Sequence, residues 1–445
     1  MNDHRPVSDK LSRRQFGQTA LGMLAAQGVA AQVLVPYWHT TAARADDAKS
    51  NRPLIGCIGV GGQGTHIGKR AMKYGDIVAV CDVQRQHAER ARNEMGGKAE
   101  VFEDYRRLLD RKDVEAVIIA TPDHWHTATA LAALKAGKHV YCEKPLTLTI
   151  DEGKLLVKAV KESGRTMQVG TMQRTDMPQF ARAVATARSG QLGKIRQVNV
   201  VLPGPSPEGG PFATKPVPEG LNWDFWLGQA PLVEFTPERC HNNFRWWYEY
   251  SGGMMTDWGA HYIDIAHWAL DCEASGPLSI DGTQTKVPKI ENGYNTPSTS
   301  IVDMVYPNDV QVKITSGGDH GVLIIGEHGR IFVDRGKITG KPIENQDADE
   351  KLKAPILEAA TALFKGNTAR MGDHMGNFFE AFMHNKHPVS DVVSQHRVVS
   401  ACHLANISIR LGRKLNWDPI KEMFVGDSEA NTWLSREPRK GYEIA

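Results

Sequence analysis

Short apolar runs alternate with amphipathic segments over the part of the chain that follows residue 52. The apolar runs have the length of strands, and the segments between them show helical patterns. The predicted strands are Leu54–Ile58, Ile77–Cys81, Ala116–Ala120, His139–Cys142 and Met167–Val169, with helices at Ala128–Ala136 and Asp151–Lys161. Strands that alternate with helices of this length predict a parallel, doubly wound sheet, which we assign to residues 52–170.

The pattern changes beyond a predicted helix at Met177–Ser189. Residues 195–202 alternate as a half-buried strand does, and residues 203–222 are rich in Pro and Gly and predict a long excursion. More strands are expected at Ile301–Tyr306, Val310–Thr315, Val322–Ile325 and Arg330–Val333, and helices at Asp373–His384 and Val392–Leu411. Residues 171–445 therefore predict a second α/β domain with an open, mostly antiparallel sheet, whose last helices can pack back on the first domain.

The first residues have the features of a targeting segment. A twin-arginine pattern at Ser12-Arg13-Arg14-Gln15-Phe16 precedes a weakly apolar stretch from Leu21 to Val35 and an Ala43-Arg44-Ala45 cleavage pattern. Together these predict a twin-arginine export signal over residues 1–45 and a periplasmic or extracytoplasmic location. An uncleaved lipid-facing anchor is the alternative. Because the twin-arginine route carries folded proteins, the chain is expected to take up any cofactor before export.

Composition limits the classes of partner. The chain has 445 residues, enough for two domains, and 41% hydrophobic residues, as a soluble globular protein has. Its net charge of +2 gives no basic surface for nucleic acid, and nothing past residue 50 approaches a membrane span. The cysteines form no C-x-x-C pair, so neither a zinc site of that kind nor a disulfide framework is expected. They are Cys57, Cys81, Cys142, Cys240, Cys272 and Cys402.

A glycine-rich turn joins the first predicted strand to a helix-like segment. It reads Gly59-x-Gly61-x-x-Gly64, with Gly62 and Gln63 inside it. The first glycine permits a tight turn, the second lets the backbone approach a pyrophosphate, and the third lets the helix pack close to the strand. The helix N-terminus then faces the negative charge, so this turn predicts dinucleotide binding.

The second predicted strand ends on Asp82, at the position where an acid accepts hydrogen bonds from the adenosine ribose. Its charge repels a 2′-phosphate and favours NAD. Arg85 lies close enough in sequence to accommodate such a phosphate, so NADP stays possible.

Two further motifs can carry chemistry. The strand at residues 139–142 leads into Glu143-Lys144-Pro145, at the carboxyl end of a parallel sheet, where ligands of such folds bind. Further on, a segment after Gly252-Gly253 places four side chains on one helix face by their spacing. These are Asp257, His261, Asp264 and Trp268.

Together with the glycine turn, these motifs resemble the Gfo/Idh/MocA oxidoreductase family over nearly all of the chain after residue 52. A finer resemblance is to an exported, twin-arginine subgroup found in planctomycetes and related bacteria, carried by Gly170–Arg174, Trp223–Gly228 and Phe244–Trp247. The family implies a Rossmann domain, a second α/β domain and dimers or tetramers formed through the open sheet. It also implies a nicotinamide cofactor, which export would require to be tightly held.

The family's catalytic residues correspond to Lys144, Asp257 and His261. Oxidation of a carbinol sends hydride to the nicotinamide while the hydroxyl proton leaves. A neutral imidazole at His261 suits the role of base, and Asp257 can orient that ring or take the proton itself. An ammonium at Lys144 stabilises the developing alkoxide.

The resemblance also assigns binding roles. The loop after the third predicted strand is expected along the cofactor, and an aromatic segment with two arginine-containing motifs is expected at the substrate. The cofactor-binding candidates are Thr121, Pro122, His124, Trp125, His126, Glu143 and Lys144, besides the glycine turn and Asp82; the substrate-binding candidates are Gln173, Arg245, Trp246, Asp257 and His261. Flat faces at Trp223, Trp226, Trp246, Trp247 and Tyr248 suit sugar rings.

The expected function is an NAD(P)-dependent oxidoreductase that acts on a hydroxyl of a sugar, glycoside or cyclitol. A redox-neutral glycosidase or lyase, which oxidises a ring carbon, eliminates the aglycone and returns the hydride, is the alternative. A non-catalytic sugar- or nucleotide-binding protein is a third possibility. A metal is not expected, although His241, His261, Asp257 and Asp264 include the right residue types.

Overall fold

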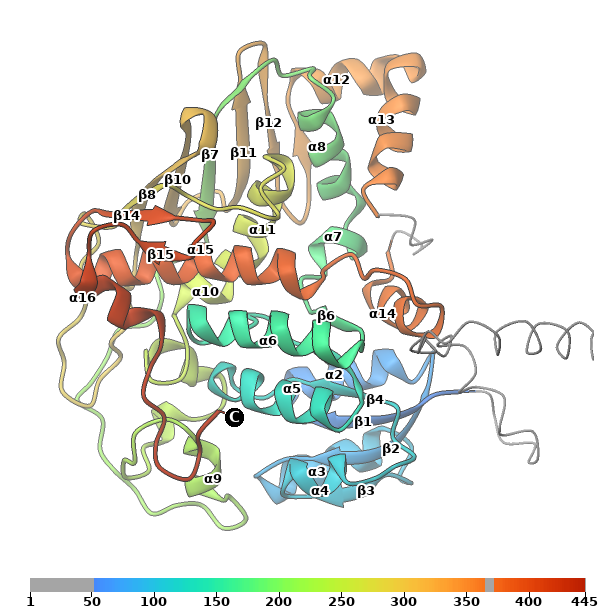
Figure 1. The fold of residues 1–445 in the computed structure, drawn as a ribbon, viewed down its shortest axis with the longest axis vertical. Helices are drawn as coiled ribbons and strands as arrows, with labels where there is room; N and C mark the ends of the chain where they lie inside the picture. Colours follow the sequence, from blue (N-terminus) through green and yellow to red (C-terminus); the bar gives the residue numbers. More distant parts are fainter. Residues whose placement is uncertain (1–51, 365–371, 445) are drawn as a thin grey trace, which may run out of the picture. The chain divides into compact units, whose positions relative to one another are not determined.

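The computed structural model describes residues 52–364 and 372–444. The predicted export signal at residues 1–45 lies outside these residues. Residues Arg52–Ala445 form one compact unit, and Figure 1 shows its two sheets with helix α15 (Val392–Leu411) running between them.

The first sheet has six strands in the order β3-β2-β1-β4-β5-β6, all parallel. The strands are β3 (Glu100–Phe102), β2 (Asp76–Cys81), β1 (Leu54–Ile58), β4 (Ala116–Ile119), β5 (His139–Cys142) and β6 (Met167–Val169). The chain reverses its direction of winding between β1 and β4, which opens a crevice beyond the carboxyl ends of these strands. The predicted parallel, doubly wound sheet is confirmed.

Helices cover both faces of this sheet. Helices α2 (Gly62–Ala71), α3 (Arg85–Glu94) and α14 (His374–Met383) pack on one face, and α4 (Tyr105–Leu109), α5 (His126–Lys135), α6 (Ile150–Ser163) and the first half of α15 pack on the other. Because the strands are buried on both faces, they read as continuous apolar runs rather than as alternating ones; all of β4 is buried.

The second sheet has nine strands in the order β13-β12-β11-β7-β10-β9-β8-β14-β15. Only β7 and β10 pair in parallel; every other described pairing in it is antiparallel. The strands are β13 (Ile338–Thr339), β12 (Gly329–Val333), β11 (Gly321–Gly326), β7 (Ile195–Leu202), β10 (Val310–Ser316), β9 (Ile301–Tyr306), β8 (Ser279–Asp281), β14 (Leu415–Asp418) and β15 (Met423–Phe424). This confirms the predicted open, mostly antiparallel sheet.

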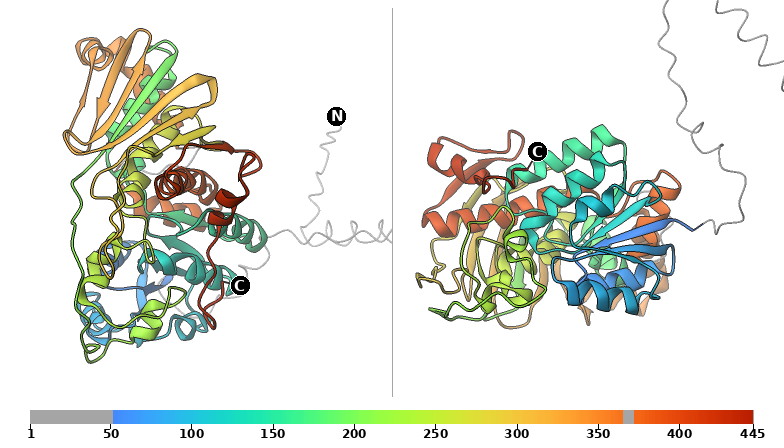
Figure 2. Two further views of the ribbon diagram at one scale, coloured as in Figure 1. Left: turned by 90° about the vertical axis from the view of Figure 1, so that its left-hand side faces the viewer. Right: turned by 90° about the horizontal axis from the view of Figure 1, so that it is seen from below.

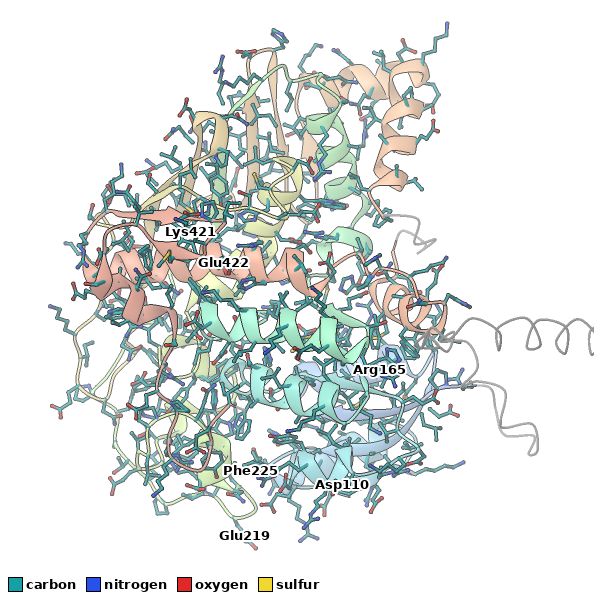
Figure 3. All side chains as sticks on the ribbon, in the orientation of Figure 1. Asp110, Arg165, Glu219, Phe225, Lys421 and Glu422 are labelled. Atoms are coloured by element: carbon teal, nitrogen blue, oxygen red, sulfur yellow. The ribbon has the colours of Figure 1, made fainter. Side chains whose placement is uncertain are left out.

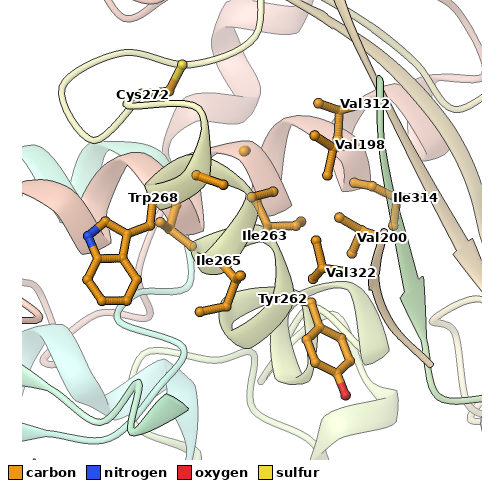
Figure 4. Packing of buried hydrophobic residues seen from close by; sticks show 14 of the residues in the cluster. Val198, Val200, Tyr262, Ile263, Ile265, Trp268, Cys272, Val312, Ile314 and Val322 are labelled. Carbon is orange, nitrogen blue, oxygen red and sulfur yellow. The ribbon is translucent and has the colours of Figure 1, made fainter. Parts of the chain in front are cut away.

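One face of the second sheet carries the largest apolar core. Inward residues of β7, β10 and β11, such as Val200, Ile314 and Val322, pack against Ile263 of α11 (Gly259–Ala269) (Figure 4). Helix α8 (Pro178–Arg188) covers the same face. The alternation of buried and half-buried residues along β7 follows from this one-sided cover.

An aromatic cluster fills the long excursion after β7. It contains helix α9 (Trp223–Leu227), where the rings of Trp223 and Trp226 stack with centroids 4.8 Å apart. Phe225, also on α9 and labelled in Figure 3, stacks on the ring of Tyr105 and lies beneath the guanidinium of Arg106 of α4. The excursion thereby forms a wall beside the first sheet.

The C-terminal segment returns to this wall (Figure 2). Beyond α16 (Ser428–Asn431), Arg439 donates to the carbonyl of Gly228 over 2.9 Å and pairs with Asp224 of α9. Tyr442 donates its hydroxyl to the same carboxylate over 2.6 Å, and its ring lies edge-on to Trp125, 5.9 Å away.

All six cysteines are buried and unpaired. Burial raises the pKa of the Cys57 thiol to about 12, so this sulfur behaves as a small apolar group. Within the residues that the structure describes, no helix is both long and apolar enough to cross a membrane.

Candidate active site

The turn between β1 and α2 is closed by contacts that leave no room for side chains. Gly59 has φ +78°, and a Cβ there would lie 2.5 Å from the backbone nitrogen of Thr121. A Cβ on Gly64 would lie 1.9 Å from the carbonyl oxygen of Gly59, whereas one on Gly62 would meet open space. The first turn of α2 therefore sits directly on the strand ends and presents free backbone N–H groups to the space above it.

A cavity of about 1010 Å³ extends from this turn to the second half of the chain. One end is lined by the glycine turn and Asp82, and the other by Lys144, Asp257 and His261. The sequence-predicted cofactor end and catalytic end are thus parts of one cavity, at the carboxyl ends of the parallel strands.

At the first end, Asp82 follows β2, and its carboxylate accepts a hydrogen bond from the Gln84 N–H over 2.9 Å. Arg85 is turned away: its side chain pairs with Glu89 over 2.8 Å, and it is not among the residues lining the cavity. Of the two residues that the sequence motif relates to the ribose, Asp82 therefore lines the cavity and Arg85 does not.

At the other end, Lys144 lies two residues after the end of β5 and forms an ion pair with the Asp257 carboxylate. Its ammonium also donates to the Asp257 carbonyl over 3.0 Å, and Arg245 Nε lies 3.4 Å from the same carboxylate. Burial alone would raise the pKa of Asp257, but the charges of Lys144 and Arg245 hold it well below its usual range. Asp257 is therefore an anion clamped between two cations.

His261 lies in the first turn of α11, and its ring reaches the cavity. Burial, with the nearby charges of Lys144 and Arg335, holds the pKa of His261 well below its usual range, so the imidazole is neutral. Its Nδ1 is buried and has no hydrogen-bond partner within residues 52–364 and 372–444.

The expected orientation of His261 by Asp257 does not occur in the structure. The four-residue spacing assumes one continuous helix, but α10 (Met254–Asp257) ends before Trp258 and α11 starts after it. Asp257 is bonded to Lys144 instead, and no hydrogen bond joins it to His261 among the described residues. Asp264, on the same predicted face, is buried against Arg174.

The loop after β4 divides into residues that line the cavity and residues behind it. Thr121, Pro122 and Trp125 line the cavity, as expected for cofactor-binding residues, but His124 and His126 do not. The ring nitrogens of His126 lie 2.7 Å and 3.0 Å from the carbonyl oxygens of Pro145 and Thr121. His126 therefore ties this loop to the loop that carries Lys144, instead of facing the cavity.

Two buried acidic side chains also line the cavity: Glu143, as expected for a cofactor-binding candidate, and Asp123. Glu143 is buried against Gly170, where a Cβ would come within 2.8 Å of its Oε1. Asp123 is buried and accepts the Ser251 hydroxyl at a hydrogen-bond distance of 2.5 Å. Burial raises the pKa of Glu143 and raises that of Asp123 to about 7, so both favour the protonated form more than an exposed acid does.

The substrate-binding candidates also divide into residues that line the cavity and residues that do not. Arg245 lines the cavity, whereas Gln173 and Trp246 do not. The buried Gln173 amide, oriented with its nitrogen toward α11, donates to the His261 carbonyl over 3.0 Å and accepts from Arg335 Nε over 3.1 Å. Of the aromatic residues proposed for sugar faces, Trp226 lines the cavity, while Trp223, Trp247 and Tyr248 lie outside its lining.

Sequence reasoning missed Arg335 and Met172, which also line the cavity. Arg335 belongs to the turn between β12 and β13, far in sequence from every motif, so no spacing pointed to it. Its guanidinium lies over the ring of Trp258, 4.2 Å from the centroid. Within the described part of the chain, no group of three or more His, Cys, Asp or Glu side chains is placed to hold a metal ion.

Comparison with known proteins gives two family matches. The description "Oxidoreductase family, NAD-binding Rossmann fold" (GFO_IDH_MocA) matches residues 54–171, and "Oxidoreductase family, C-terminal alpha/beta domain" matches residues 210–338 and 350–444. An inositol 2-dehydrogenase of Salmonella typhimurium is 34% identical over 282 residues, which cover 60% of this chain and 72% of that protein. A scyllo-inositol 2-dehydrogenase (NAD(+)) of Bacillus subtilis is 29% identical over 263 residues, 58% of this chain and 66% of that one.

Solved structures share the fold. The WlbA dehydrogenase from Bordetella pertussis, in complex with NADH and UDP-GlcNAcA, superposes with a TM-score of 0.62 at 19% identity, covering 83% of this chain and 99% of that one. Levoglucosan dehydrogenase, in complex with NADH and levoglucosan, gives a TM-score of 0.56 at 17% identity, covering 82% and 99%. At these identities the likeness concerns the fold alone.

Proposed function

The chain belongs to the Gfo/Idh/MocA oxidoreductase family and is an NAD-dependent dehydrogenase, and from this premise we propose that it oxidises a secondary hydroxyl of a sugar, glycoside or cyclitol. The observation that carries the proposal is the single cavity shared by the glycine turn, Lys144 and His261. A bound dinucleotide and a carbinol can therefore meet in it.

The residues at the first end fit NAD. The close contacts at Gly59 and Gly64 and the open space over Gly62 form a cradle for a pyrophosphate, on the N-terminus of α2. Asp82 is placed to accept hydrogen bonds from the adenosine ribose, and Arg85 is turned away, which supports NAD over NADP. When bound, NAD supplies the acceptor for the hydride.

At the other end, the protein's own groups handle the hydroxyl. The neutral imidazole of His261 is positioned to accept the hydroxyl proton. The ammonium of Lys144, held by the side chain and the carbonyl of Asp257, stabilises the developing negative charge on the oxygen. Asp257 is a positioning residue for Lys144 in this proposal, because its carboxylate is occupied by two cations.

The class of substrate is supported by the relatives, whose names are those of inositol and sugar dehydrogenases. Trp226 and Trp258 offer flat faces at the cavity wall for the C–H faces of a ring. The redox-neutral glycosidase alternative finds no support among the relatives named above.

The experiment that tests the proposal is a substitution of His261. His261→Asn is expected to lower kcat/KM about 10²- to 10⁴-fold, the usual effect of losing a positioned base, while the Kd for NADH changes little. NADH formation from a panel of hexoses, glycosides and inositols gives the rates, and ligand titration gives the Kd. The exposed His328 serves as a matched control, and His328→Asn is expected to behave as the parent does. Unchanged turnover in His261→Asn would contradict the assignment of the base.

We also propose, from the N-terminal pattern of residues 1–45, that the protein is exported through the twin-arginine route with NAD tightly bound. Fractionation of the producing cells tests the location; a protein found wholly in the cytoplasm would contradict it. A dimer or tetramer formed through the less covered face of the nine-stranded sheet is likewise proposed, and a monomeric molar mass in solution would contradict that assembly.

A further inference from the structure

A hydrogen-bonded turn holds Arg335 in the cavity wall. Its turn connects β12 to β13, and the Asp334 carboxylate closes it by accepting the N–H groups of Gly336 and Lys337, each over 2.7 Å. From α8, the Gln179 amide donates to the carbonyls of Asp334 and Arg335 over 3.2 Å and 2.8 Å. The backbone that presents Arg335 is therefore fixed from two sides.

The guanidinium is fixed as well, but only along one edge and one face. Its Nε donates to the buried Gln173 oxygen over 3.1 Å, and its plane lies over Trp258. Neither terminal nitrogen of Arg335 has a hydrogen bond or a carboxylate partner among the residues described. The side chain is half-buried and lines the cavity, so these two donors remain available to a ligand.

The acids nearby do not offset its charge. Asp257 is already shared by Lys144 and Arg245, and Asp334 is committed to its own turn. Asp123 and Glu143 also line the cavity, but they are buried against Ser251 and Gly170, and no ion pair joins either of them to Arg335 among the described residues. Lys144 and Arg245 thus share Asp257, whereas Arg335 lines the cavity without a carboxylate partner among the described residues.

We propose that the two free guanidinium nitrogens of Arg335 bind an anionic group of the substrate, so that the enzyme oxidises a sugar carrying a carboxylate or a phosphate rather than a neutral sugar or cyclitol. The planar pair of donors matches the two oxygens of such a group, and stacking on Trp258 keeps the plane in place. This inference rests on the proposed function, since it places the carbinol of the same molecule between Lys144 and His261.

The reaction itself is unchanged by the anion. The carbinol C–H bond breaks, its hydride passes to NAD, and the O–H proton goes to His261, which leaves a ketone and NADH. The anionic group stays bound at Arg335 and takes no part in these bonds. Arg335 is therefore a specificity-determining residue.

The test compares each acid with its neutral parent on the full-length protein loaded with NADH. Titrations use hexuronates and hexose 6-phosphates against the corresponding hexoses, together with myo-inositol. At least one acid is expected to bind about 10-fold or more tightly than its parent, and the comparison of the two series shows whether carboxylate or phosphate is preferred. In Arg335→Gln, the affinity of the acid relative to its neutral parent is expected to fall about 10- to 100-fold, as it does when a charge-assisted hydrogen-bonded pair is lost. Arg335→Lys is expected to show an affinity ratio between those of the parent enzyme and Arg335→Gln.

The matched control is Arg330→Gln, which removes an exposed arginine from the same hairpin, outside the cavity, and is expected to leave the acid preference unchanged. A panel in which no acid binds more tightly than its neutral parent overturns the proposal, and so does an Arg335→Gln protein that keeps the full preference. If neutral sugars are oxidised with NAD under those conditions, the proposed function stands without this inference. If NADH itself does not bind, it is the proposed function that fails.

Discussion

Asp123 has a protonation equilibrium that couples the site to the stability of the fold. Burial raises its pKa to about 7, with the Ser251 hydroxyl as its hydrogen-bond donor. In the unfolded chain the pKa of an aspartate is about 3.9. Between these two values the folded state holds more protons than the unfolded state, so the free energy of unfolding falls as the pH rises, and the loss is complete above the folded pKa.

Replacement of Asp123 by Asn should remove this loss while keeping an acceptor for Ser251. Between pH 5 and pH 8, the parent is expected to lose about 2.5 kcal/mol of stability relative to Asp123→Asn. Urea unfolding of both proteins at the two pH values measures the difference. The exposed Asp110→Asn is the control, and it should follow the parent. Parallel pH dependences for Asp123→Asn and the parent would show that the carboxyl is ionised throughout.

Single residues also show how far the sequence predicts the site. Lys144, Asp257 and His261 were found because motifs mark them, and the structure brings them to one cavity. Arg335 was missed, because a residue in a hairpin turn reaches the cavity only through the folding of the second sheet. The roles of His124 and His126 were assigned from the family resemblance of their loop, but adjacent residues of a loop can face opposite sides of a wall.

At the scale of elements, a buried ion pair joins three helices behind the site. Arg174 of α7 (Gln173–Asp176) donates from Nε to both carboxylate oxygens of Asp264 on α11, over 3.0 Å and 2.9 Å. Gln395 of α15 donates to the same carboxylate over 2.8 Å. Both charged side chains are at most 1% exposed. Arg174 also pairs with Glu273 over 2.7 Å, whereas the Asp264 carboxylate is compensated by Arg174 and the Gln395 amide.

Removing one partner of this ion pair should therefore lower the free energy of unfolding more than removing both partners does. Arg174→Met is expected to destabilise the protein by about 3–5 kcal/mol, because it leaves a buried carboxylate unpaired. The double variant Arg174→Met/Asp264→Leu is expected to recover a large part of that loss. Denaturant midpoints of the single and double variants measure it, with the exposed Arg107→Met as a control for arginine loss. A double variant less stable than Arg174→Met would contradict this account.

Elements with a strong pattern were predicted within one or two residues, such as α15 and the strands β1 and β5. Strand β3 was missed because it lies at the sheet edge, where Glu100 is exposed and Val101 and Phe102 are only half-buried, which leaves no apolar run to detect. The strands β8, β14 and β15 were missed because each has only two to four residues. In addition, β8 and β14 pair with each other from distant parts of the sequence, while β15 pairs with its neighbour β14. The break at Trp258 was missed because both helix pieces keep the same apolar spacing.

At the scale of the whole molecule, the end of the described chain supports the wall of the cofactor end. Arg439 and Tyr442 both bind Asp224, and Tyr442 contacts Trp125, whose other side lines the cavity. Residues more than 200 positions apart in sequence are thus combined in one wall. No local pattern predicts such a contact.

Arg439→Ala is expected to loosen this wall and raise the Kd for NADH a few-fold, since a partly exposed ion pair of this kind contributes about 1 kcal/mol. Titration with NADH measures the effect. Lys440→Ala removes the neighbouring exposed cation and should leave the Kd unchanged. Equal affinities for NADH in both variants and the parent would mean that α9 holds its place without the C-terminal segment.

The buried cysteines make it possible to measure how often each region of the fold opens locally. Buried cysteines lie on both faces of the first sheet, in the core of the second sheet and in the aromatic cluster. Examples are Cys57 under α2, Cys240 in the aromatic cluster and Cys402 on α15. An alkylating reagent reaches such a sulfur only while its surroundings open. The order in which the cysteine sulfurs are alkylated would therefore rank the regions by how often each one unfolds locally, without any engineered label.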